Sequence, residues 1–118
     1  MHKLIILIGP VAETLEFSEG WPEFLHHAED MPGLVREATV RIQGTLFGDK
    51  DIRMIHELFF DTQEALEFAL TTSQGRLAGY LIQKITGGQM SLLTAEHKED
   101  EIENLRKYKE GNPDADTQ

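Results

Sequence analysis

Histidines and isolated acidic residues are the groups in this 118-residue sequence that could do acid–base or metal chemistry. His26 and His27 are adjacent in the stretch PEFLHHAEDMPGL, and His56 precedes Glu57 in the stretch IHELFF. An imidazole titrates near neutral pH, and burial in an apolar strand raises the pKa of a carboxyl group toward the same range. These two stretches therefore contain the candidate catalytic residues.

The histidine pair lies on a predicted helix within residues 14–31, which Met-Pro-Gly ends. At 3.6 residues per turn, His26 points to solvent and His27 lies at the boundary of the buried face. We therefore retain His27 as a catalytic candidate. We predict no metal site, because His26 lacks a convincing set of further ligands. The apolar stripe of this helix consists of Trp21, Phe24, Leu25 and Ala28.

Glu57 lies in a predicted strand over residues 51–61, between large apolar residues on its own face. A carboxylate there must become protonated or find a cation, and we expect Arg41 on the neighbouring strand to supply it. The pair is either structural, fixing strand register, or an acid–base or ligand-anchoring group in a cavity. His56 points to the opposite face, toward the helices; if the faces are exchanged, His56 becomes the base in the cavity.

Two helices are predicted between the strands. The first begins at Thr14 or Ser18, and Pro22 is compatible with it only in the first turn. The second covers residues 61–85, starts with Asp61 in a capping-box-like pattern, and is interrupted by TTSQG.

The elements occur in the order β-α-β-β-α-β, which is typical of the ferredoxin-like α+β fold. In this fold an antiparallel four-stranded sheet has both helices on one face. We expect residues 1–97 to form this domain and residues 98–118 to form a charged tail, with a short helix and a disordered end. Besides the strand that holds Glu57, strands are predicted over residues 3–9, 34–44 and 89–97.

The predicted central strands are apolar on both faces, although helices can cover only one. A second copy is the simplest cover for the other face, because two-fold homodimers are the commonest oligomers. Sheets packed about 10 Å apart can enclose a cavity. We predict that Leu4, Ile6, Ile8, Leu58 and Phe60 face the helices. We predict that the partner-facing set is Ile5, Leu7, Ile55, Glu57, Phe59 and Leu93, with Thr39 and Arg41, and that Trp21, Phe24, Phe59 and Phe47 supply aromatic lining to the cavity.

Composition excludes several classes of function. The formal net charge of −10 would repel nucleic acids and anionic membranes. There are no cysteines, which excludes disulfides and thiol chemistry and fits a cytoplasmic protein. The apolar run over residues 4–8 is too short for a membrane span or the centre of a signal peptide. We therefore expect a soluble cytoplasmic protein.

Several stretches resemble the EthD family of dimeric α/β-barrel proteins, together covering residues 1–97. The stretches MHKLIILI and MPGLVREATV of this chain resemble the N-terminal half of the family. The stretches HELFFDTQEALEFALTTSQGRLAGYL and TGGQMSLLTAEH resemble its C-terminal half. The resemblance implies a homodimer whose two sheets form a barrel around a cavity for small, often aromatic molecules. Relatives in this barrel class include cofactor-free cyclases, isomerases, oxygenases and haem-degrading enzymes.

We therefore expect a cofactor-independent homodimer that binds a small hydrophobic or aromatic molecule. As an enzyme it would transfer protons, in a cyclisation, isomerisation or decarboxylation, with Glu57, His27 or His56 as the base. No Walker-type loop or Gly-x-Ser-x-Gly motif indicates a nucleotide cofactor or a serine nucleophile. The alternatives are a non-catalytic ligand-binding or accessory dimer, and a haem- or oxygen-handling monooxygenase in which His27 or His56 ligates iron.

Overall fold

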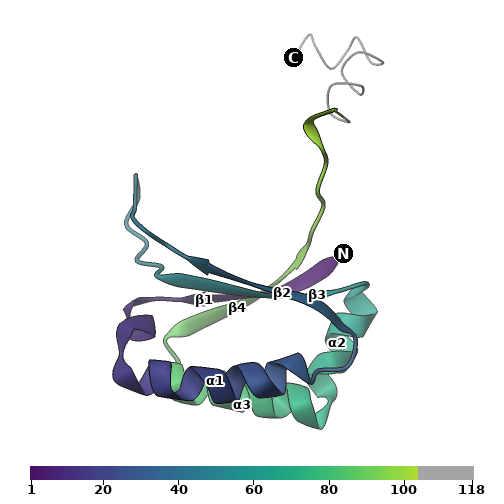
Figure 1. Cartoon of the computed structure of the whole chain (residues 1–118), viewed down its shortest axis with the longest axis horizontal. Helices are drawn as coiled ribbons and strands as arrows, with labels where there is room; N and C mark the ends of the chain where they lie inside the picture. Colours follow the sequence, from purple (N-terminus) through teal and green to yellow (C-terminus); the bar gives the residue numbers. More distant parts are fainter. Residues whose placement is uncertain (104–118) are drawn as a thin grey trace.

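The computed structural model describes residues 1–103 and shows a four-stranded sheet with helices on one face (Figure 1). The strands lie in the order β2-β3-β1-β4, and all neighbours are antiparallel. This arrangement confirms the ferredoxin-like α+β fold. The predictions for residues 104–118 lie outside the described residues. Along the chain the elements are β1 (His2–Ile8), a 3-10 turn (Pro10–Glu13), α1 (Leu15–Glu29), β2 (Leu34–Arg41), β3 (Met54–Phe60), α2 (Gln63–Thr71), α3 (Ser73–Thr86) and β4 (Met90–Glu96).

The helix-covered face of the sheet holds the hydrophobic core. Alternate residues of β1 and β3 point into it, because side chains along a strand alternate between faces. Burying one such side chain contributes about 1.5–3 kcal/mol, so this layer is the main source of stability. The five residues predicted to face the helices are all buried, which confirms that assignment: Leu4, Ile6, Ile8, Leu58 and Phe60.

Threonine side chains cap the starts of α1, α2 and α3. Thr14, Thr62 and Thr72 each accept a hydrogen bond from the backbone N–H three residues on, at 3.0–3.3 Å. Thr14 is one of the two predicted caps of α1. The prediction of Asp61 is wrong by one residue, because α2 begins after Thr62. No helix within residues 1–103 is long and apolar enough to cross a membrane.

Pro22 lies in the middle of α1, so the prediction that this helix tolerates it only in the first turn is wrong. The cap at Thr14 starts the helix early and places Pro22 two turns inside it. A proline there removes the hydrogen bond to the carbonyl of Ser18. Both Pro22 and Ser18 are exposed, so water can bind to that carbonyl.

Residues 42–53 join β2 to β3 as a long projecting segment, which we call the arm. The strands predicted over residues 34–44 and 51–61 left only residues 45–50 to join them. Figure 1 shows the arm rising on the side of the sheet that carries no helix. Arg53 fixes its base: its guanidinium donates to Asp51 and to Glu13, at 2.6 Å each. The backbone N–H of Arg53 also donates to the carbonyl of Ile8 at 2.8 Å.

The other face of the sheet carries no helix, and we call it the helix-free face. Two predicted members, Thr39 and Arg41, do not belong to it. The register pairs Thr39 with the buried His56, and directly paired residues of antiparallel strands share a face. Arg41 lies two residues further along β2 and points the same way. The predicted members that the register does place on this face are Ile5, Leu7, Ile55, Glu57, Phe59 and Leu93.

Candidate functional site

His56 is the one buried titratable side chain among residues 1–103, and it is only 1% exposed. It lies on β3 beneath α1, on the helix side of the sheet as predicted. The rings of Trp21 and Phe24 meet the imidazole edge-on, with centroids 5.1 and 6.1 Å away. Burial lowers the pKa of His56 to about 4, so the imidazole is neutral at physiological pH.

Two side chains of β2 reach the imidazole of His56. Thr39 Oγ1 lies 2.9 Å from Nδ1, and Glu37 Oε2 lies 3.3 Å from Nε2. The second contact lacks the geometry of a hydrogen bond. Glu37 Oε2 and His56 Nε2 are therefore buried without a hydrogen-bond partner among the described residues. Such atoms cost about 1–3 kcal/mol each, and in native proteins they commonly mark a bound water, a ligand or a catalytic role.

Glu37 also lies close to a second carboxylate, Glu29, at the end of α1. Burial, together with the hydrogen bond and negative charge of Glu29, raises the pKa of Glu37 to about 7. Glu37 is therefore close to half-protonated at neutral pH. We call His56, Glu37, Glu29 and Thr39 the His56 cluster. It combines a neutral imidazole with a carboxyl group that can donate or accept a proton near pH 7.

An aromatic wall along α1 covers the His56 cluster. Trp21 stacks on Phe17 and on Phe24, with centroids 5.1 Å apart in both pairs. Trp21 is half-buried and Thr39 is exposed, so the cluster is approached from the β2 edge of the sheet. Phe24 contacts both His56 and a narrow apolar cavity of about 40 Å³, whose lining includes Leu4, Leu58, Ala78, Gly79, Ile82 and Leu92.

Glu57 lies on the helix-free face, on the opposite side of the sheet from the His56 cluster. It forms an ion pair with Lys3 of β1, and both side chains are mostly buried. The predicted partner, Arg41, is wrong because it points toward the helices. Lys3 reaches Glu57 because the register sets it opposite Phe59, two residues along β3 from Glu57. A satisfied ion pair of this kind favours the structural interpretation.

Phe59, predicted to line a cavity, is buried within its own chain. The guanidinium of Arg36 lies 4.2 Å above its ring centroid, and the Lys3 ammonium lies 5.3 Å away. His97 packs edge-on against the same ring, with centroids 5.0 Å apart. On the helix-free face, Ile55 remains half-buried and available to a partner.

The structure does not bring His27 together with the other candidates in a single site. Its Nδ1 lies 3.3 Å from Gln74 Oε1 on α3, so this half-buried imidazole links two helices. His26 is exposed, as predicted. Within residues 1–103, no group of three His, Asp or Glu side chains is arranged to hold a metal ion.

Glu37 and Glu29 were not among the residues predicted to form a site. Alternation groups Glu37 with Thr39 and Arg41, but these were predicted to face the partner, so it did not place Glu37 beside His56. Nothing local in the sequence shows that the end of α1 delivers Glu29 to the same place.

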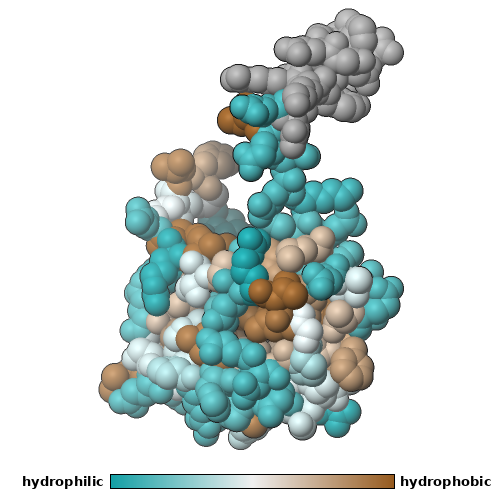
Figure 2. All heavy atoms as spheres, turned by 45° about the vertical axis from the view of Figure 1, so that its right-hand side comes forward, coloured by the Kyte–Doolittle hydropathy of each residue, from teal (hydrophilic) through white to brown (hydrophobic). Residues whose placement is uncertain are grey.

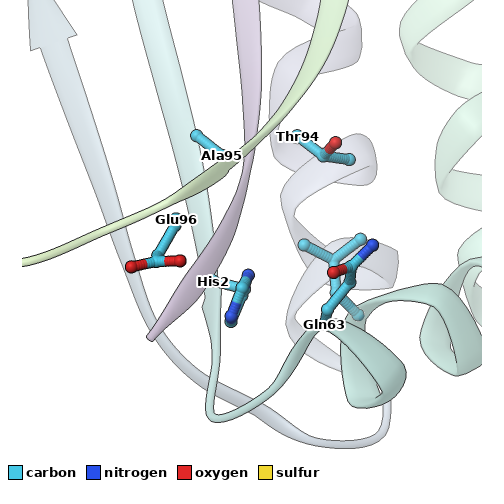
Figure 3. Close-up of a pocket in the computed structure, with 6 residues that line it drawn as sticks. His2, Gln63, Thr94, Ala95 and Glu96 are labelled. Carbon is cyan, nitrogen blue, oxygen red and sulfur yellow. The ribbon is translucent and has the colours of Figure 1, made fainter.

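A wider hollow of about 250 Å³ lies where the starts of β1 and α2 meet the end of β4 (Figure 3). Figure 3 shows His2 between Gln63 on one side and Glu96 on the other. Gln63, Thr94 and Glu96 are exposed, and a hydrogen bond from Lys98 lowers the pKa of Glu96. The polar groups here are thus solvated. The His56 cluster, with its buried unpartnered atoms, is the stronger candidate site.

The sheet order and the helices on one face define the class of this protein as ferredoxin-like α+β. Within that class, the chain is similar to an EthD family protein from Bacillus halodurans C-125, known from a crystal structure. The two are 26% identical, the match covers 83% of this chain and 99% of that one, and the TM-score is 0.75. This similarity confirms the resemblance that the sequence motifs indicated.

Two more distant solved structures share the fold. One is a dimeric ferredoxin-like protein of unknown function from Jannaschia sp. CCS1, with 13% identity, a TM-score of 0.63, and coverage of 81% of this chain and 98% of that one. The other is a variant of SnoaB, a cofactor-independent oxygenase from Streptomyces nogalater, with 14% identity, a TM-score of 0.58, and coverage of 84% and 93%. No protein-family model matches the chain, and no curated protein matches its sequence.

Proposed function

We propose that this chain forms a homodimer that binds a small hydrophobic or aromatic molecule beside the His56 cluster and transfers protons on it without a cofactor. The observation that carries the proposal is the pair of buried atoms His56 Nε2 and Glu37 Oε2, 3.3 Å apart and without hydrogen-bond partners among the described residues. The rings of Trp21 and Phe24 flank this pair and favour an aromatic or apolar ligand.

The His56 cluster can move a proton without creating a separated charge. When the Thr39 hydroxyl donates to Nδ1 of His56, the imidazole N–H is at Nε2 and faces Glu37. When Glu37 is protonated, its O–H can face Nε2, and Nδ1–H then donates to Thr39. A ligand with an acidic C–H or O–H can give its proton to the Glu37 carboxylate, and the protonated form can return it to another atom.

The helix-free face supports the homodimer. Its apolar side chains include the exposed Val40 and Leu93, which a second copy would cover. Two molecules with a charge of −10 repel each other, but on this face Lys3 pairs with Glu57 and Arg36 pairs with Glu99, so the charges there are balanced. The Jannaschia neighbour and another from Bacteroides fragilis are described as dimeric.

Proton transfer can be tested with β-tetralone, an aromatic ketone with acidic C–H bonds. We expect the protein to speed deuterium exchange at these positions in heavy water, followed by NMR. His56→Gln should lower the protein-catalysed rate at least about 100-fold. His26→Gln, which changes an exposed histidine on α1, should leave the rate unchanged. Equal rates for wild type and His56→Gln would remove the catalytic part of the proposal.

Binding and dimerisation have separate readouts. Trp21 is the only tryptophan, so its fluorescence should change saturably as β-tetralone is added.

In sedimentation equilibrium, Val40→Asp with Leu93→Asp should produce monomers, because the charges would be buried between the sheets. Leu15→Asp, at an exposed position on α1, is the control. A wild type that sediments as a monomer would contradict the proposed dimer.

A further inference from the structure

The tip of the arm, residues 46–47, carries the two most exposed large apolar side chains of the described residues. Leu46 is 104% exposed and Phe47 is 98% exposed, so neither is covered by its own chain. The arm rises on the same side of the sheet as the helix-free face (Figure 1), and Figure 2 shows apolar atoms at its far end. The rest of the arm is polar or glycine-rich near this tip. An adjacent leucine and phenylalanine fully in water indicate a surface that another molecule covers.

The arm is held in this direction at its base. Arg53 bonds to Asp51 and Glu13, and its carbonyl accepts a hydrogen bond from the N–H of Ile42 at 3.0 Å. These contacts join the two ends of the arm to each other and to the 3-10 turn, and the N–H of Arg53 bonds to Ile8 of β1. The base of the arm is therefore fixed at the sheet, and the tip extends from it on the helix-free side.

We propose that the arm of each protomer packs Leu46 and Phe47 against a second copy of this chain and clasps the dimer. The inference rests on the proposed homodimer. Sheets that pack face to face lie about 10 Å apart, so an arm rising from one sheet passes beside the other protomer. The arm also continues directly from the proposed interface, since Val40 of the helix-free face lies near the end of β2, where the arm begins. By two-fold symmetry the contact forms twice.

The double variant Leu46→Ser with Phe47→Ser tests the clasp in the full chain. Four apolar side chains leave the dimer contact, so we expect its dissociation constant to rise at least about 100-fold in sedimentation equilibrium. Thermal unfolding of the protomer at low concentration should stay the same, because both side chains are fully exposed. The matched control is Leu15→Ser with Phe68→Ser, an exposed pair on the helices, which should leave the dissociation constant unchanged.

Photo-cross-linking locates the tip directly. With Phe47 replaced by p-benzoylphenylalanine in an equal mixture of ¹⁴N- and ¹⁵N-labelled chains, irradiation should give cross-links between light and heavy chains. A wild-type dimer with cross-links only within one chain, or with an unchanged dissociation constant for the double variant, overturns the clasp and leaves the proposed homodimer intact. A monomeric wild type overturns both.

Discussion

Glu37 and His56 should give stability opposite dependences on pH. Burial raises the pKa of Glu37 from 4.5 to about 7, so its contribution to stability is full below pH 4.5 and is lost as the pH rises through 7. Burial lowers the pKa of His56 from 6.5 to about 4, so its contribution is full above pH 6.5 and is lost as the pH falls through 4. Between pH 4.5 and 6.5 the two effects oppose each other in the wild type, and removing either group should expose the other.

The size of each effect follows from the pKa shifts. A shifted group changes the free energy of unfolding by at most about 1.4 kcal/mol per pH unit, or about 2.7 kcal/mol from pH 4.5 to 6.5. The Glu37 side chain is 29% exposed, and solvent screening should reduce its effect to about half. Relative to wild type, Glu37→Gln should therefore gain about 1 kcal/mol of stability as the pH rises across this window. His56→Gln should lose about 2 kcal/mol across the same window.

The assay is urea unfolding of wild type and both variants at several pH values from 4.5 to 6.5. Far-UV circular dichroism should follow unfolding, because protonation of His56 can itself change the fluorescence of the nearby Trp21. Glu23→Gln and His26→Gln are matched controls at exposed positions on α1. If the Glu37 and His56 variants gave flat differences, or differences of the same sign, the arrangement of charge proposed for the cluster would be refuted.

Three further predictions concern stability. Gly75→Ala on α3 places a Cβ 2.1 Å from a carbonyl oxygen in the last turn of α2, so thermal unfolding should show a loss of stability of at least about 2 kcal/mol. Gly79→Ala, in open space on α3, should gain up to about 1 kcal/mol of stability. Similar values for the two variants would contradict the clash. Glu57→Ala leaves Lys3 unpaired and should cost about 2 kcal/mol in urea unfolding, whereas Lys3→Met with Glu57→Leu should recover most of it if the pair is structural. Thr39→Val removes a hydrogen bond to the buried imidazole and should cost about 1 kcal/mol, and the imidazole ¹⁵N shifts should report a changed tautomer; unchanged shifts would count against that bond.

The sequence by itself predicted the elements and divided the side chains of the two central strands into two alternating sets. Alternation along β1 and β3 placed Ile6 and His56 toward the helices, and both are buried there. The second helix was predicted to end at residue 85, and the structure ends it just beyond, at Gly87 and Gly88, with positive φ of 59° and 79°. These features depend on neighbouring residues in the chain, so local periodicity and backbone preferences suffice to predict them.

Only the tertiary structure decided which face β2 presents and therefore which residues surround His56. Alternation along β2 fits two registers, and a slip of one residue exchanges its faces. The pairing observed follows from the long arm and from an irregularity between Leu34 and Arg36, neither of which local periodicity specifies. Packing of α1 then brings Glu29 to Glu37. Burial and nearby charge set the pKa values of the cluster, and both arise only when distant segments of the chain pack together.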